Sequence, residues 1–130
     1  METTLLAPVS AGELADKITV LKIKSEHISD AQKKSNIDKE LALLMNVFTE
    51  AVSQTPEITD ALARLKAVNL EIWDLSDKIH ECERKNIYTE DDIVFYRVIH
   101  TKNDMRFSIK KEINTLAKSG IVEEKSYEGQ

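Results

Sequence analysis

The sequence predicts an all-α protein: a helical bundle of about four helices, with a long antiparallel hairpin formed by the last two. Apolar residues recur at spacings of three and four, which places them on one face of an α-helix. Only three glycines and two prolines interrupt the chain, too few for a turn-rich β fold. We therefore expect one helical domain over residues 1–130, with an N-terminal arm at 1–9 and a C-terminal tail at 121–130.

The first two predicted helices occupy the first half of the chain. Ser10 and Glu13 have the spacing of a capping box, and an apolar stripe follows as far as Ile28. The second helix is predicted to begin at Ser35, after the pattern fades. Its own apolar stripe continues to a turn at residues 54–56, where a proline stops it.

The last two predicted helices are the longest. Thr55 can cap the third and Pro56 suits its first position, while Thr89 and Asp92 can cap the fourth. Each helix should be about 40 Å long, and the short connection between them makes them antiparallel. The unbroken stripe of the third helix consists of Ile58, Ala61, Leu65, Val68, Ile72, Leu75, Ile79 and Cys82.

The composition restricts where the protein can be located and which kinds of functional site it can contain. With 32% charged residues and no long apolar run, we expect no membrane span, and residues 1–11 lack the basic start of a signal peptide. We expect a cytoplasmic protein. Cys82 is the only cysteine, and the three histidines fall on different predicted helices. The sequence therefore predicts no metal site, no cofactor and no catalytic residue, although it leaves open whether the protein is an enzyme.

A polar layer interrupts the predicted hairpin near its middle. If the antiparallel hairpin turns near Ile87, two residues whose numbers add to about 174 lie at the same height along the two helices. This places Lys102 beside Ile72 and Arg106 beside Val68. Arginine and lysine bind anions, and tryptophan stacks on flat groups. The layer is therefore a candidate ligand site, or alternatively a device that fixes the register of the helices without a ligand. Its members are Asn69, Trp73, Asp77, Lys102, Asn103, Asp104 and Arg106.

Three functions are compatible with these patterns. The one we favour is a non-enzymatic interaction or assembly module that forms a homodimer or higher oligomer, because extra apolar positions such as Leu62, Leu70 and Val94 exceed what one small bundle covers. An unidentified protein partner is also possible. The alternative is a binder or enzyme for a small anionic metabolite. Nucleic-acid binding has the least support, since the net charge is −5.

Four ordered motifs carry a resemblance to a known family. The segments GELADKITVLKIK, AVNLEIWDLSDKI, HTKNDMRFSIKKEIN and VEEKSY together resemble a family of small bacterial and phage proteins described only as a domain of unknown function. The resemblance implies no activity, but it points to positions in each motif. They are Glu13, Asp16 and Lys17; Asn69, Trp73 and Asp77; Asn103, Asp104, Arg106 and Asn114; and Glu123, Glu124, Lys125 and Tyr127.

The tail motif and a second resemblance complete the predictions. Mixed charges around an aromatic side chain suit docking of the tail on the bundle or on a second subunit, through Glu123, Glu124, Lys125 and Tyr127. The chain is also similar to the helical chorismate mutases in being small and all-α. That family binds its substrate with arginines of its first helix, whereas no arginine precedes Arg64 here. This likeness therefore implies no shared activity.

Overall fold

The computed structural model describes residues 2–86, 88–121 and 124. Over these residues the chain forms four helices and no strand: α1 (Ala11–His27), α2 (Ala31–Ala51), α3 (Pro56–Lys85) and α4 (Glu90–Leu116). The predicted all-α bundle is confirmed. None of the helices in the described part of the chain combines the length and the apolarity that crossing a membrane requires.

Side-chain caps begin three of the helices where the sequence predicts. The Ser10 hydroxyl accepts the backbone N–H of Glu13 at 3.1 Å, and Thr55 caps α3 in the same way. Thr89 and Asp92 form a reciprocal capping box at the start of α4, at 3.0 and 3.2 Å. These contacts satisfy amides that have no partner within the helix, so the caps fix the boundaries.

The predicted start of the second helix is wrong by about one turn. The helix begins at Ala31, because the carboxylate of Asp30 accepts a backbone N–H at 3.0 Å and acts as the cap. Ser35, the predicted first residue, lies inside α2. Asp38, which we expected near the start, instead accepts a hydrogen bond of 2.6 Å from the Ser25 hydroxyl of α1.

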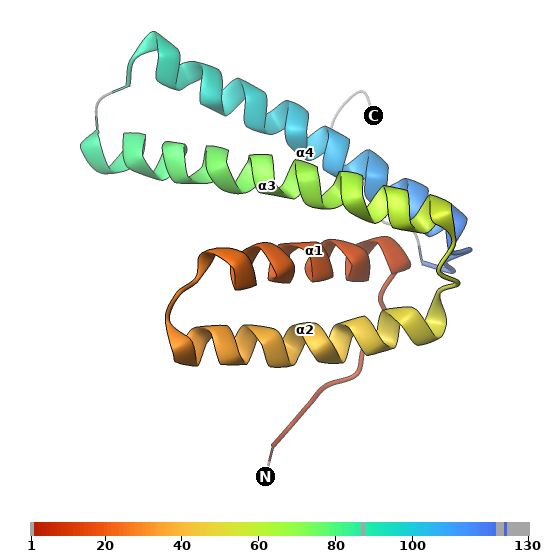
Figure 1. Ribbon diagram of the computed structural model, residues 1–130. Coiled ribbons are helices and arrows are strands. Elements are labelled where there is room, and N and C mark those ends of the chain that lie inside the picture. The colour runs from red at the N-terminus through yellow and green to blue at the C-terminus, as the bar shows by residue number, and fades with distance from the viewer. Residues whose placement is uncertain (1, 87, 122–123, 125–130) are drawn as a thin grey trace.

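The helices form three layers, with α1 in the middle (Figure 1). One side of α1 packs on α2, and the other side packs on both α3 and α4. The apolar core lies mainly between α1 and the α3–α4 pair, and Phe48 and Val52 close it from the α2 side. Its other buried members are Ala15, Ile18, Ile58, Ala61, Leu65, Val68, Ile109 and Ile113.

Helices α3 and α4 are antiparallel neighbours over most of their length (Figure 1). Lys102 binds Glu71 of α3 at 2.5 Å, one residue from the level predicted for it, so the predicted register is confirmed. Nearer the core, Arg64 holds the carboxylate of Glu112 with two hydrogen bonds of 2.7 and 2.9 Å. α3 ends at Lys85 and is followed by Asn86 in the left-handed conformation, with φ 53°.

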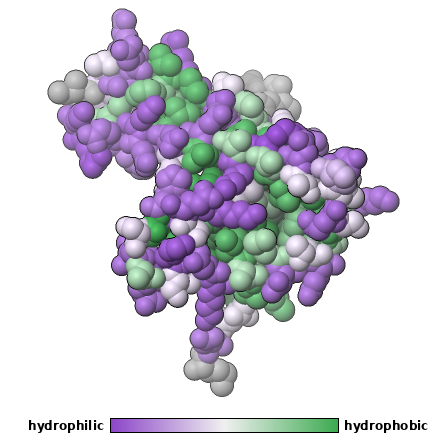
Figure 2. Space-filling view, in the orientation of Figure 1, coloured by the Kyte–Doolittle hydropathy of each residue, from purple (hydrophilic) through white to green (hydrophobic). Residues whose placement is uncertain are grey.

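The outer part of this pair extends beyond the ends of α1 and α2 (Figure 1). We call residues 74–86 and 88–101 the distal hairpin. Cys82 is its only buried residue among those described, whereas seam residues such as Leu75, Ile79 and Phe95 are half-buried. Figure 2 shows hydrophobic surface gathered there among hydrophilic residues. Two helices alone cannot enclose their shared seam, which explains the partial burial.

Candidate functional site

An ion pair joins the first helix to the last. The carboxylate of Asp16 in α1 accepts hydrogen bonds from Nε and Nη2 of Arg106 in α4, at 2.8 and 2.5 Å. The Asp16 side chain is 5% exposed and that of Arg106 is 31% exposed. Two parallel N–H bonds to one carboxylate make a geometrically specific contact. The pair therefore fixes how α1 lies against α4.

Helix α3 contributes the third side of this cluster. Asn69 is buried, and its amide nitrogen donates to Asp16 Oδ1 at 2.9 Å and to the Thr19 hydroxyl oxygen at 2.8 Å. Thr19 in turn donates to the backbone carbonyl of Asp16 at 2.8 Å. Buried polar groups are stable only when they are hydrogen-bonded, and these groups supply each other's partners.

The surroundings of Asp16 keep it ionised. Its burial alone would raise the pKa of this carboxyl group. Hydrogen bonds from Arg106 and Asn69, together with the positive charges of Arg106 and Lys110, outweigh that effect and lower the pKa below its ordinary value. The cluster therefore consists of a buried carboxylate that is matched by a cation at neutral pH.

Two further contacts extend the α1–α4 interface toward the start of α1. Lys110 binds the Glu13 carboxylate at 2.7 Å, and Asn114 Oδ1 accepts the backbone N–H of Gly12 at 2.6 Å. A Cβ atom on Gly12 would overlap the backbone carbonyl of Lys110. Glycine is thus required here by the close approach of the two helices. The Ser10 half of the predicted capping box forms. The Glu13 carboxylate binds Lys110.

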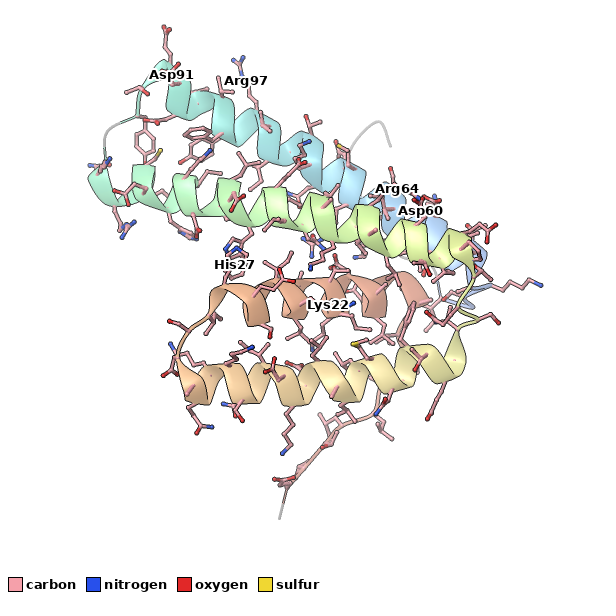
Figure 3. All side chains as sticks on the ribbon, viewed as in Figure 1. Lys22, His27, Asp60, Arg64, Asp91 and Arg97 are labelled. Carbon is pink, nitrogen blue, oxygen red and sulfur yellow. The ribbon has the colours of Figure 1, made fainter. Side chains whose placement is uncertain are left out.

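A cavity of about 330 Å³ opens beside the ion pair. Its apolar wall comes from both α1 and α3, and its polar groups come from α3 and α4. The ring of His27 packs against the Trp73 ring, with centroids 5.6 Å apart, and Figure 3 shows His27 between the end of α1 and α3. The lining residues are Val20, Ile23, Asn69, Ile72, Trp73, Ser76, Asp77, His80 and Arg106.

The structure brings together four of the seven residues of the predicted polar layer. Asn69, Trp73, Asp77 and Arg106 line this one cavity. The other three do not line it: Lys102 pairs with Glu71, and Asp104 lines a separate groove between α3 and α4. Asn103 is half-buried on α4 and lines neither space.

Three basic side chains of α4, spaced by four residues, form a strip along one face of the helix. Lys102, Arg106 and Lys110 bind Glu71, Asp16 and Glu13, respectively. Two of these three acids belong to α1, so the strip joins α4 to the rest of the bundle.

The predicted tail contacts lie largely beyond what can be described. Glu123, Lys125 and Tyr127 fall outside the described residues, and Glu124 is exposed. Tail docking therefore stays a prediction. Among the described residues, no group of three or more His, Cys, Asp or Glu side chains is arranged to hold a metal ion.

The predicted polar layer did not include Asp16 or Thr19, although the family resemblance pointed to Asp16 as a motif position. Register arithmetic relates α3 to α4, which follow each other in the chain, but it says nothing about where α1 docks. The helix itself also carries a signal: Gly12, Asp16 and Thr19 recur at spacings of four and three, and so form a small and polar stripe on one face of the first helix. Such a stripe on a helix that also carries a full apolar face indicates a close polar contact with a partner helix.

Comparison with known proteins supplies a family and no activity. No curated protein and no solved structure shows significant similarity to the chain. One protein family does match, over residues 5–130, and its description is "Family of unknown function (DUF6165)". This match covers all four helices and the whole polar cluster. The chain therefore belongs to the family of unknown function DUF6165.

Proposed function

We propose that this protein is a non-enzymatic assembly module that self-associates through the outer face of its α3–α4 hairpin. The observation that carries the proposal is a second stripe on α4. Val94, Val98, Thr101, Met105 and Ser108 recur at spacings of four and three, so they share one face over about 21 Å of helix. This stripe is distinct from the apolar residues of α4 that pack into the core, such as Ile109 and Ile113.

This stripe borders an open groove. The groove has a volume of about 580 Å³, and all of its lining residues come from α3 and α4. Its floor is apolar, with Ala67, Val68 and Ile109 beside Met105. Val94 and Met105 are exposed, and the polar Thr101 lies between them on the same face, so a partly apolar face extends from the groove into the distal hairpin. Exposed apolar side chains among polar groups are typical of a protein interface.

A second copy of the chain is the occupant we favour. Charged groups at the groove rim are already matched within the chain, since Arg64 binds Glu112 and Glu71 binds Lys102. In a twofold dimer each patch meets its own copy, and rims whose charges are matched in this way do not repel each other. Pairing two such hairpins would create a four-helix arrangement that covers the half-buried distal seam.

The two other functions considered from the sequence have less support. A small-anion site needs positive charge that is not already matched, but Arg106 binds Asp16 and Lys102 binds Glu71. Nucleic-acid binding needs several basic groups that can reach phosphates. The strip of α4 is paired with carboxylates along its length.

The experiment compares two matched double variants by sedimentation velocity. Val94→Glu with Met105→Glu alters the proposed face, where the side chains are 50% and 42% exposed. The control is Val47→Glu with Met45→Glu on α2, at 47% and 37% exposure. We expect the wild type and the control to form dimers or larger species at about 100 μM, and the α4 variant to be monomeric, because an interface of this kind tolerates no buried unpaired charge.

Two results would overturn the proposal. One is a strictly monomeric wild type at about 1 mM, a concentration at which even a weak specific dimer with a Kd near 100 μM would be populated. The other is loss of assembly in the α2 control but not in the α4 variant, which would place the interface on α2. Circular dichroism on both variants checks that the helices are intact.

A further inference from the structure

We propose that the cavity beside Trp73 binds small organic cations, in which an ammonium group is attached to a compact hydrocarbon body. This activity is separate from self-association, because the cavity lies where α1 meets α3 and the proposed interface contains no residue of α1. The cavity volume of about 330 Å³ is at the lower end of the range for small-molecule sites.

The wall of the cavity suits a hydrocarbon body. Val20 and Ile23 of α1 face Ile72 and Trp73 of α3 across it. Ile23 is almost fully buried, so this side of the wall is rigid. Small-molecule sites characteristically combine such an apolar wall with a few convergent polar groups, and the polar groups here decide the charge of the ligand.

The charges around the cavity favour a cation. Arg106 contributes one positive charge, but Asp16 matches it at hydrogen-bond distance. Asp77 also lines the cavity and forms no ion pair with any described residue. His80, the other ionisable group of the wall, lies 4.0 Å from Glu83. Among the lining residues, the carboxylate of Asp77 is therefore the charged group without an ion-pair partner in the described part of the chain, and it attracts an ammonium group.

The uncharged groups that line the cavity also favour a positively charged ligand. Both amide hydrogens of Asn69 are used on Asp16 and Thr19, so Asn69 offers its carbonyl oxygen, an acceptor, as its further hydrogen-bonding group. Trp73 presents an indole ring, whose face attracts cations. The packed ring of His27 helps to hold that indole in place. Acceptors and a π face together select a ligand that donates N–H groups.

The test uses three probes with one hydrocarbon body and different charge. They are 2-cyclohexylethylamine, 3-cyclohexylpropanoate and 2-cyclohexylethanol, which do not absorb where tryptophan is excited. Trp73 is the only tryptophan in the chain, so its fluorescence reports on the cavity. We expect saturable binding of the amine, about tenfold tighter than that of the carboxylate, from one ion pair and one cation–π contact.

Two variants test which residue sets the preference. Asp77→Asn should reduce the preference for the amine over the carboxylate to less than about threefold, because it removes the uncompensated charge. Asp74→Asn is the matched control, since Asp74 is an exposed acid three positions away on α3 that does not line the cavity. It should keep the preference of the wild type. Both residues are exposed, so neither change disturbs the core.

Calorimetry supplies a readout that does not depend on fluorescence. Trp73→Leu should weaken binding of the amine at least about fivefold, whereas Trp73→Phe, which keeps an aromatic face, should weaken it less. Equal or tighter binding of the carboxylate would overturn the proposal. The proposal would also fail if the amine showed no saturable binding up to about 10 mM, a concentration above ordinary millimolar affinity. An equal loss of preference in Asp74→Asn and Asp77→Asn would contradict it as well.

Discussion

The guanidinium group of Arg106 binds the carboxylate of Asp16 across the interface between the last and the first helix, at 2.5 and 2.8 Å. The two residues are 90 positions apart in the sequence. Asn69 of α3 donates to the same carboxylate, so three of the four helices meet at Asp16. This contact ties the polar layer of the α3–α4 pair to α1.

Replacing Asp16 by asparagine should destabilise the protein by about 2–4 kcal/mol, because the change leaves the guanidinium of Arg106 partly buried without its anion. Urea denaturation at pH 7 measures the free energy of unfolding. Asp38→Asn is the matched control. Asp38 also accepts a side-chain hydrogen bond from another helix, but it is exposed to solvent, so its loss should cost clearly less stability than the loss of Asp16. Equal losses in the two variants would contradict the special role of Asp16.

The stability of the wild type should fall in acid, and Asp16 should account for part of the fall. The pKa of Asp16 is lower in the folded chain than in the unfolded chain. Its contribution is therefore complete above the unfolded pKa, near 3.9, and is lost as the pH falls through the lower folded pKa. The unfolding free energies of wild type and Asp16→Asn should differ most at pH 7 and converge toward pH 2. A constant difference across this range would contradict the assignment.

Gly12→Ala should destabilise the protein by about 1–3 kcal/mol, because the added methyl group overlaps the backbone carbonyl of Lys110 and crowds Asn114. Helix propensity alone predicts the opposite sign, since alanine is favoured over glycine within helices. Gly120→Ala is the control, because nothing lies within 4 Å of its added Cβ. Thermal or urea denaturation distinguishes the two signs directly. A stabilised Gly12→Ala variant would show that α1 and α4 are less close than described.

The Cys82 thiol should react slowly with a disulfide reagent at pH 8. Burial and a hydrogen bond to Asp92 raise its pKa, so the reactive thiolate is scarce and poorly accessible. We expect the rate to rise at least about a hundredfold when the chain is unfolded in urea. A chain with Cys82→Ser and Ser29→Cys places the thiol at an exposed position and provides the fast reference. A native rate equal to this reference would contradict the burial of Cys82.

The sequence predicts most of the helical framework because its signals are local. Caps such as Ser10, Thr55 and Thr89 act within one turn, so their spacing is enough to locate the helix starts. The register of α3 against α4 also follows, since a short connection constrains two consecutive helices. Asp30 shows the limit, because an aspartate between two helices can end one or begin the next, and only the structure distinguishes these roles.

The candidate site is less predictable because it depends on α1. Four of the seven expected residues share a cavity, and all four lie on the hairpin whose register could be worked out. Asp16, which matches the charge of Arg106 beside that cavity, lies on a helix whose docking angle no local pattern specifies. From the sequence alone Arg106 counts as an available cation, which suggests an anion site as one alternative. In the folded protein Asp16 pairs with Arg106, and this pairing is one ground for proposing a cation site instead.

The central position of α1 has a consequence for the order in which the molecule can assemble. Gly12 and Asn114 bond to each other across 102 positions, and the contacts of Glu13 and Asp16 close loops of similar size. Such loops cost more entropy to close than those within a single hairpin. The α1–α2 and α3–α4 hairpins can each form early from nearby contacts, and their docking along α1 should then limit the folding rate. Variants at Asp16 or Gly12 should therefore alter that docking step, while changes at the helix caps alter the formation of each hairpin.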